Sequence, residues 1–163
     1  MSEATAINYE ALHERLQHLF SNLKVLVVDD MPTNIDNIRL LLLRLGVQRS
    51  HIQTATNGLD AFTRIASFKP HLVTADWNMP VMNGLEFAKK VRAVPQFESL
   101  LIVMLTAEAE LDLEQARPYV NAFLRKPATN ATIEKMLLSV LGKKVLQEGH
   151  PLQQLNQAGG TQR

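Results

Sequence analysis

The 163-residue sequence contains no cysteine, which excludes disulfides, thiolate metal sites and cysteine nucleophiles. It also lacks any apolar run close to the roughly 18 to 20 residues of a membrane span. Neither sign of charge dominates, because 17 basic and 16 acidic side chains are interspersed along the chain. This balance gives no electrostatic basis for binding nucleic acid or a membrane surface. The N-terminus has neither the basic n-region nor the apolar h-region of a signal peptide, so we expect a cytoplasmic protein.

What the sequence does contain is a set of short apolar segments at regular spacing. They are rich in Val, Ile and Leu and mostly continuous, which is typical of strands buried on both faces. The segments are Val25–Val28, Ile52–Thr56, His71–Ala75, Leu100–Leu105 and Val120–Leu124.

Helical spacing fills the intervals between these segments. We expect helices from Pro32 to Gly46, from Asn57 to Phe68, from Gly84 onward, from Glu108 to before Pro118, and from Thr129 or Asn130 to Gly142. Five strand–helix units in strict alternation predict an α/β fold, an open doubly wound parallel sheet with helices on both faces. The length suits one domain with a sizeable core.

Two segments flank this alternating region. Residues 1–23 form an N-terminal helical extension in our interpretation, since its apolar residues lie on one face of an amphipathic helix. These residues are Leu12, Leu16, Leu19, Phe20 and Leu23. The helix either packs on the core or on a twin subunit, or it docks a partner and is released by a signal. Residues 143–163 are polar toward their end, and we expect a disordered C-terminal tail there.

Polar residues stand directly after alternate apolar segments. Asp29 and Asp30, Asp76, Thr106 and Lys126 would meet, because the carboxyl ends of parallel strands share one edge of a sheet. Three neighbouring carboxylates repel one another unless a divalent cation or a raised pKa relieves them. Mg²⁺ suits oxygen ligands of this kind.

The chemistry that fits this set is phosphoryl acceptance. The carboxylate of Asp76 is the candidate nucleophile for a phosphoryl group, giving an acyl phosphate. Lys126 supplies a positive charge for phosphate oxygens, and Thr106 offers a hydroxyl donor.

Four strings, VLVVDD, ADWNMPVMNG, IVMLTAEAE and FLRKPA, occur in this order. Over residues 24–142 they resemble the receiver domain of two-component response regulators, most closely the single-domain, CheY-like chemotaxis type. The resemblance implies a flavodoxin/CheY-like (βα)5 fold with strand order 2-1-3-4-5. It implies that a histidine kinase or histidine phosphotransfer protein phosphorylates Asp76 with Mg²⁺. The chain would be no enzyme, except in catalysing its own phosphorylation and dephosphorylation.

The resemblance also assigns roles to single residues. The implied metal ligands are Asp29, Asp30, Asp76 and the main-chain carbonyl of Asn78. Thr106, Lys126 and the aromatic Phe123 would bind the phosphoryl group and report its presence. Asn78 and Glu108 would tune hydrolysis of the aspartyl phosphate.

The output implied by the resemblance is a phosphorylation-dependent protein-binding surface around the fourth helix, fifth strand and fifth helix. Phe123 lacks the usual tyrosine hydroxyl, Pro118-Tyr119 replaces a Gly-Ala turn, and AEAELDLE is acidic where chemotaxis receivers tend to be basic. The sequence therefore leaves the downstream partner unnamed. A homodimer through that surface or through the N-terminal helix stays open.

Two alternatives keep the same site. The chain could act as a phosphoryl sink or phosphorelay intermediate without its own output. It could also be a Mg²⁺-dependent aspartyl phosphohydrolase, but those enzymes need a second carboxylate two residues after the nucleophile. That position is Asn78, which argues against hydrolysis of small phosphate esters.

Overall fold

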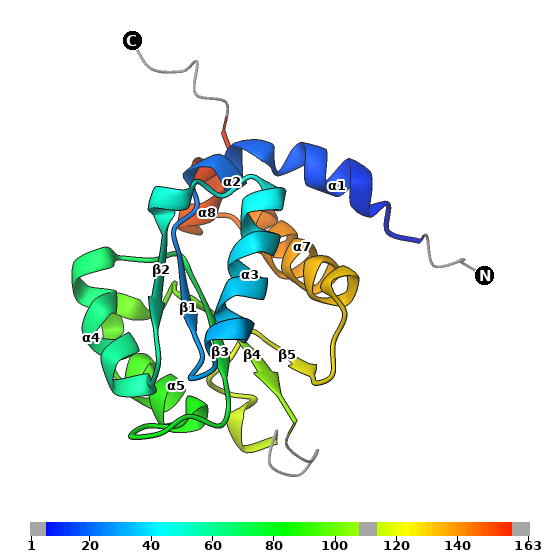
Figure 1. The fold of residues 1–163 in the computed structure, drawn as a ribbon. Coiled ribbons are helices and arrows are strands. Elements are labelled where there is room, and N and C mark those ends of the chain that lie inside the picture. The colour runs from blue at the N-terminus through cyan, green and yellow to red at the C-terminus, as the bar shows by residue number, and fades with distance from the viewer. Residues whose placement is uncertain (1–5, 108–113, 158–163) are drawn as a thin grey trace.

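The computed structural model describes residues 6–107 and 114–157. Its centre is a five-stranded parallel sheet with the order β2-β1-β3-β4-β5 (Figure 1). The strands are β1 (Val25–Val28), β2 (Ile52–Ala55), β3 (Leu72–Asp76), β4 (Leu101–Thr106) and β5 (Ala122–Arg125). The predicted doubly wound α/β fold and its strand order 2-1-3-4-5 are confirmed.

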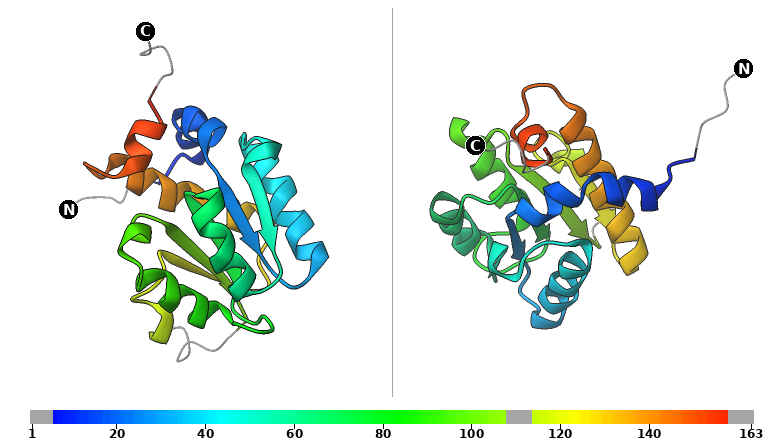
Figure 2. Two further views of the ribbon diagram at one scale, coloured as in Figure 1. Left: turned by 90° about the vertical axis from the view of Figure 1, so that its left-hand side faces the viewer. Right: turned by 90° about the horizontal axis from the view of Figure 1, so that it is seen from above.

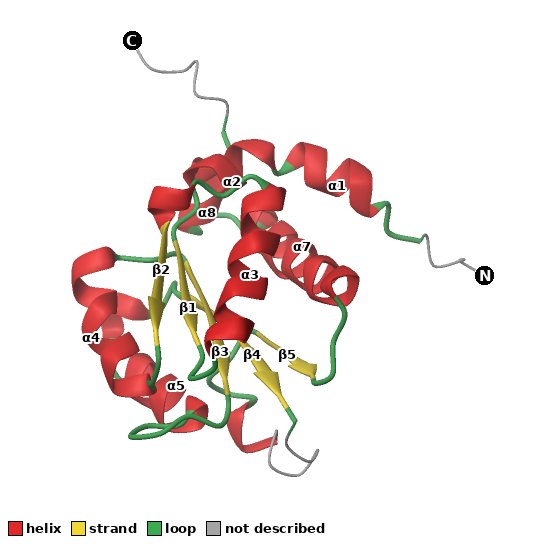
Figure 3. Ribbon diagram, viewed as in Figure 1, coloured by secondary structure: helices red, strands yellow, loops and turns green. Residues whose placement is uncertain are grey.

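Helices cover both faces of this sheet (Figure 3). On one face lie α3 (Pro32–Leu45) and α7 (Asn130–Leu146), and on the other lie α4 (Gly58–Phe68) and α5 (Gly84–Arg92). Short 3-10 turns precede β2 (η1, Arg49–His51) and β4 (η2, Pro95–Phe97). Side chains of β1 alternate between the two cores, with Val25 and Val27 on the α3 side and Leu26 and Val28 on the α4 side. Burial on both faces explains why these strands are continuously apolar.

Local sequence signals set the helix boundaries. Pro32 occupies the first turn of α3, and Gly46 ends it in a left-handed conformation with φ of 114°. The side chain of Asn57 caps α4, and that of Thr129 caps α7. Asn83 forms a capping box with Glu86 at the start of α5. Of the helix predicted from Glu108, residues 108–113 lie outside the described residues, and residues 114–116 are helical.

The N-terminal extension consists of two short helices packed on the domain. They are α1 (Tyr9–Arg15) and α2 (Gln17–Asn22), with a break at Leu16, whose ψ is 11°. Leu16, Leu19, Phe20 and Leu23 are buried in the core that α3 and α7 share. Figure 2 shows α1 crossing over α7. The part of the apolar stripe from Leu16 to Leu23 is therefore covered by the same chain.

The C-terminal segment is more ordered than the sequence predicts. The prediction of disorder over residues 143–163 is wrong for its described part, because α7 continues to Leu146 and α8 (Pro151–Leu155) follows. Leu152 is buried in the same core as α2. Its burial and the hydrogen bonds of Asn156 to α1 and α2 contribute to offsetting the entropy of ordering this segment. Residues 158–163 lie outside the described part. No helix in the described ranges has the length and apolar character needed to cross a membrane.

Candidate functional site

The carboxyl ends of four strands bring the predicted polar residues to the same edge of the sheet. Asp29 follows β1, Asp76 ends β3, Thr106 ends β4, and Lys126 follows β5. The amide of Lys126 donates to the carbonyl oxygen of Thr106 at 2.7 Å, which extends the pairing of β4 and β5 as far as Lys126. Because all the strands are parallel, their carboxyl ends converge as predicted.

Three carboxylates form the centre of the site. One oxygen from each of Asp29, Asp30 and Asp76 lies within 4.8 Å of the others. Asp29 is 5% exposed and Asp76 is 8% exposed, whereas Asp30 is open to solvent. All the candidate ligand atoms are carboxylate oxygens, and Asp30 leaves the site open to water. This suits Mg²⁺, which binds one or two carboxylates and retains several water ligands. The donor chemistry therefore fits the metal that the sequence predicts.

Hydrogen bonds fix the orientation of Asp29. Its Oδ1 accepts from the amide of Met31 at 2.9 Å, and its Oδ2 accepts from Nδ2 of Asn34 at 3.1 Å. Asn34 lies in the first turn of α3, and sequence reasoning gave it no role. The sequence signal for this role is the position of Asn34, a short polar side chain about one helical turn after Asp29 and Asp30.

Lys126 bridges two of the carboxylates. Its Nζ lies 3.4 Å from Oδ1 of Asp76 and 3.7 Å from Oδ2 of Asp29. Burial raises the pKa of Asp76, the Lys126 cation lowers it, and the nearby Asp29 raises it again. The amide of Trp77 also lowers it, but the net pKa of Asp76 stays above its ordinary value. A cation placed among these oxygens would favour the ionised carboxylate.

The loop after β3 carries Asn78 and depends on a close backbone approach. Asn78 is exposed in this loop. The amide of Gly84 donates to the carbonyl oxygen of Trp77 at 2.8 Å, and a Cβ at Gly84 would come within 2.6 Å of the carbonyl oxygen of Asp76. Glycine at this position therefore lets α5 begin directly against the end of β3.

The two residues predicted to report phosphorylation have different environments. Thr106 is fully buried at the end of β4. Phe123 on β5 is partly buried against the core of the α4 face, and the guanidinium carbon of Arg117 lies 5.6 Å from its ring centroid. Arg117 was not singled out from the sequence, since nothing along the chain indicates which ring it contacts. Glu108 lies outside the described residues.

A cavity of about 450 Å³ opens beside Asp29 and Lys126, between the first turns of α3 and α7. Asn34, Asn130 and Ile133 contribute to its wall. The cavity therefore reaches Asp29 and Lys126 from the α3 side.

Comparison with known proteins agrees with this geometry. Residues 25–138 match the model of the response regulator receiver domain. The chain belongs to the response regulator receiver family. It is 36% identical over 121 residues to chemotaxis protein CheY-3 of Vibrio cholerae serotype O1, covering 73% of this chain and 92% of that protein.

Solved receivers show the same fold. The chemotaxis response regulator CheY4 of Vibrio cholerae matches with a TM-score of 0.66 and 32% identity, over 72% of this chain and 98% of that one. The receiver domain of sensor histidine kinase PA1611 from Pseudomonas aeruginosa matches with a TM-score of 0.65 and 25% identity, over 74% and 98%. That structure has a magnesium ion coordinated in its active-site cleft.

Proposed function

We propose that this receiver accepts a phosphoryl group on Asp76 from a phosphorylated histidine of a kinase or phosphotransfer protein. The observation that carries the proposal is the position of Asp76, a buried carboxylate with two further carboxylates within 4.8 Å and a lysine ammonium 3.4 Å away. This arrangement supplies a nucleophile, a cation site and a charge for phosphate oxygens at one strand edge. Membership of the receiver family supports the same role.

In the proposed reaction, a carboxylate oxygen of Asp76 attacks phosphorus. The new O–P bond forms as the P–N bond to the donor histidine breaks, and the imidazole leaves with the bonding electrons. Asp29, Asp30, Asp76 and the carbonyl of Asn78 would hold Mg²⁺, which neutralises charge on the transferring phosphoryl group. Lys126 would exchange its contact with the carboxylate of Asp76 for one with a phosphate oxygen.

Readout in this proposal starts at Thr106 and Phe123. The hydroxyl of Thr106 would turn toward the new phosphoryl oxygens, and Phe123 would repack behind it. The phosphoryl group can shift the equilibrium between the two arrangements of Thr106 and Phe123 only by the difference in its interaction free energy with them. Because Phe123 has no hydroxyl group, this readout rests on packing, including its contact with Arg117.

The phosphorylated surface would then bind a downstream protein in the cytoplasm. We place this surface around residues 114–116, β5 and the N-terminal half of α7, which adjoin Phe123 and Lys126 in the chain. Asn78 and Glu108 are proposed to set how long the phosphoryl group lasts. A homodimer through the same surface is a second form that the output could take.

The test is phosphorylation by acetyl phosphate with and without MgCl₂, followed by intact-mass spectrometry. Wild type should gain one phosphoryl group only with Mg²⁺, and Asp76→Asn should gain none. Asp36→Asn is the matched control, since Asp36 is an exposed carboxylate paired with Arg39 on α3. Labelling of Asp76→Asn at the wild-type level would refute the proposal.

A phosphoryl sink differs from this proposal only in having no output partner. Beryllofluoride-treated protein, immobilised and challenged with its kinase and candidate target proteins, separates the two roles. Hydrolysis of p-nitrophenyl phosphate would instead indicate a phosphohydrolase, which Asn78 at the second-carboxylate position disfavours.

A further inference from the structure

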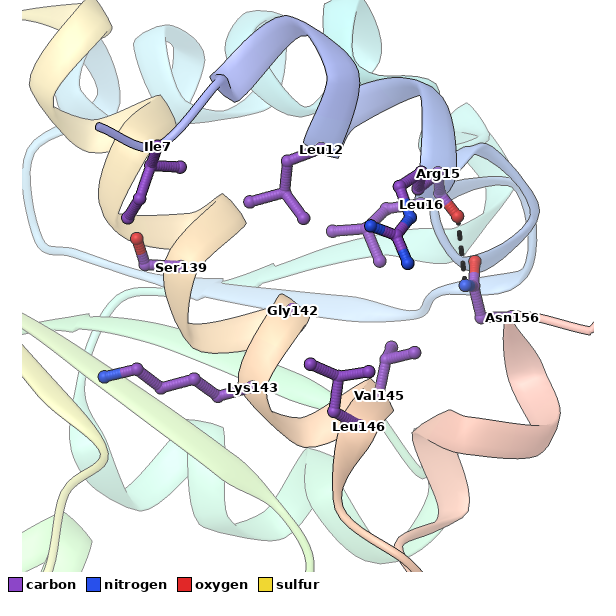
Figure 4. Close-up of a pocket in the computed structure, with 10 residues that line it drawn as sticks. All are labelled: Ile7, Leu12, Arg15, Leu16, Ser139, Gly142, Lys143, Val145, Leu146 and Asn156. Carbon is purple, nitrogen blue, oxygen red and sulfur yellow. Dashed lines mark hydrogen bonds between the residues drawn. The ribbon is translucent and has the colours of Figure 1, made fainter. Parts of the chain in front are cut away.

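A second candidate binding site lies between α1 and α7, in a groove of about 280 Å³. Figure 4 shows its lining residues, with α1 on one side, α7 on the other and α8 near one end. They are Ile7, Leu12, Arg15, Leu16, Ser139, Gly142, Lys143, Val145, Leu146 and Asn156. All ten lie outside residues 25–138, the part that matches the receiver domain. The groove therefore lies between the N-terminal extension and the C-terminal part of α7, with α8 near one end.

The walls of the groove are apolar. Leu12 and Leu16 face Gly142 and Leu146 across it. A Cβ at residue 142 would lie 3.3 Å from Cδ1 of Leu12, closer than ordinary van der Waals contact, so the glycine lets this leucine pack directly on the backbone of α7. Leu146 is 78% exposed, which is unusual for a large apolar side chain beside an apolar cavity. Covering this side chain would remove apolar surface from water.

The charge in the groove has one sign. Arg15 and Lys143 are the charged lining residues, and none of the ten is acidic. Within residues 6–107 and 114–157, neither side chain makes a hydrogen bond or ion pair. Figure 4 shows the guanidinium of Arg15 turned into the space between the helices and the ammonium of Lys143 turned away from it.

The side chain of Asn156, which lies beside Arg15, already makes hydrogen bonds to the backbone of α1 and α2. Its Nδ2 donates to the carbonyl oxygen of Arg15 at 3.0 Å, and its Oδ1 accepts from the amide of Leu19 at 2.9 Å. These bonds fix the end of α1 where the guanidinium enters the groove. Arg15 thus has its backbone fixed, and its exposed guanidinium has no hydrogen-bond or ion-pair partner among residues 6–107 and 114–157.

We propose that this groove binds a single-chain aliphatic carboxylate, a medium-chain fatty acid, with its carboxylate on Arg15 and its chain between α1 and α7. A guanidinium can donate two parallel hydrogen bonds to a carboxylate. The volume is at the lower end of small-molecule sites, as a single aliphatic chain requires.

Two other occupants fit less well. A second copy of the chain packed on this face about a two-fold axis would bring Arg15 and Lys143 of both copies together, with no acidic lining residue to balance them. A partner helix uses a row of apolar pockets over several turns, whereas this groove ends at Arg15 and Asn156. Binding of the carboxylate would join α1 to α7 and is independent of the chemistry at Asp76.

The experiment is isothermal titration of the full chain with dodecanoate below its micelle concentration. Wild type should bind one equivalent, and Arg15→Gln should bind about tenfold more weakly, as expected for loss of a charge-assisted hydrogen bond. Arg49→Gln, an exposed arginine on η1, is the matched control and should bind like wild type. Gly142→Leu should block binding, and circular dichroism checks that it folds.

Further experiments test whether the ligand must be an anion and whether it is a free fatty acid or a membrane lipid. Dodecyltrimethylammonium has the same chain with the opposite charge and should not bind; equal binding would overturn the proposal. Equal dodecanoate affinity of Arg15→Gln and wild type would overturn it too, as would a dimer dispersed by Leu146→Asp. If the protein co-sediments with phosphatidylglycerol vesicles but does not bind free dodecanoate, the groove would be a membrane-binding surface and the proposal would be wrong. Asp76→Asn should bind dodecanoate normally, so failure of the phosphoacceptor role leaves this test intact.

Discussion

At the scale of single residues, the chemistry of the site depends on a conflict at Asp76. Its carboxylate is buried and lies near Asp29, yet the proposed role as a nucleophile requires its ionised form. Lys126 relieves part of the repulsion, and a divalent cation would relieve the rest. The burial and charge that would suit Asp76 to the proposed phosphorylation therefore cost stability when no cation is bound.

This conflict predicts a pH-dependent effect of Asp76→Asn on stability. The folded-state pKa of Asp76 lies above its ordinary value of 3.8, so the folded protein binds more protons between the two values. Stability contributed by this group is present below that window and is lost as pH rises through it. Without Mg²⁺, the variant should therefore be more stable than wild type at pH 7 and lose this advantage below pH 3.8.

Urea denaturation at a series of pH values measures this difference. Saturating Mg²⁺ is the control, because it should stabilise wild type more than the variant and reduce the gap at pH 7. A variant that is less stable than wild type at neutral pH without Mg²⁺ would contradict the interpretation.

Asn34 provides a second residue-scale prediction. Since it donates to Oδ2 of Asp29, Asn34→Ala should weaken Mg²⁺ binding about tenfold by freeing that carboxylate to rotate. Fluorescence of Trp77, the only tryptophan, reports the titration from the position next to Asp76. Asn37→Ala, an exposed asparagine on the same helix, should leave the affinity unchanged. An unaltered affinity in Asn34→Ala would show that Asp29 needs no such support.

At the scale of elements, the two terminal extensions form a joint cover over the ends of α3 and α7. Asn156 bonds α8 to α1 and α2, and Nδ2 of Asn22 contacts the carbonyl oxygen of Leu155 at 3.4 Å. The imidazole of His13 lies 2.8 Å from the carbonyl oxygen of Leu45 at the end of α3. Segments far apart in sequence thereby satisfy one another's polar groups at the edge of the core.

The element-scale prediction concerns α8. Leu152→Ala should cost about 2 to 5 kcal/mol, because this side chain is 1% exposed in the core. Leu146→Ala removes the same atoms from a side chain that is 78% exposed and should change stability by less than about 0.5 kcal/mol. Guanidinium chloride denaturation measures both variants. Equal, small effects would mean that α8 adds nothing to the folded core.

At the scale of the whole molecule, the N-terminal extension and the receiver share one hydrophobic core. Leu19, Phe20 and Leu23 have no exposed surface and belong to the same cluster as β1, β3 and β4. Segments that share a core are expected to unfold together. The extension is in this respect part of the domain and no loosely tethered arm.

Phe20→Ala tests that cooperativity. The variant should lose about 3 to 5 kcal/mol, and near- and far-ultraviolet circular dichroism should still report a single transition. Gln17→Ala, exposed on the same helix, should be close to neutral. Hydrogen exchange of residues 17–23 should stay slow when beryllofluoride is added. Faster exchange would instead support a docking arm that phosphorylation releases.

Periodicity and the placement of polar residues determined most of the fold and the membership of the site. Continuous apolar runs such as Val25–Val28 need burial on both faces, and a parallel sheet forces Asp29, Asp76 and Lys126 to one edge. These inferences depend only on local pattern and on chain direction, which the sequence contains.

Only the tertiary structure decided what the extensions do and which neighbours tune the site. The polar tail offered no periodic signal, yet Leu152 is buried in the core and belongs to α8. Asn34 against Asp29 and Arg117 against Phe123 are contacts between particular side chains. The groove between α1 and α7 likewise arises from segments more than a hundred residues apart. Such contacts depend on how elements pack in space, which no local pattern specifies.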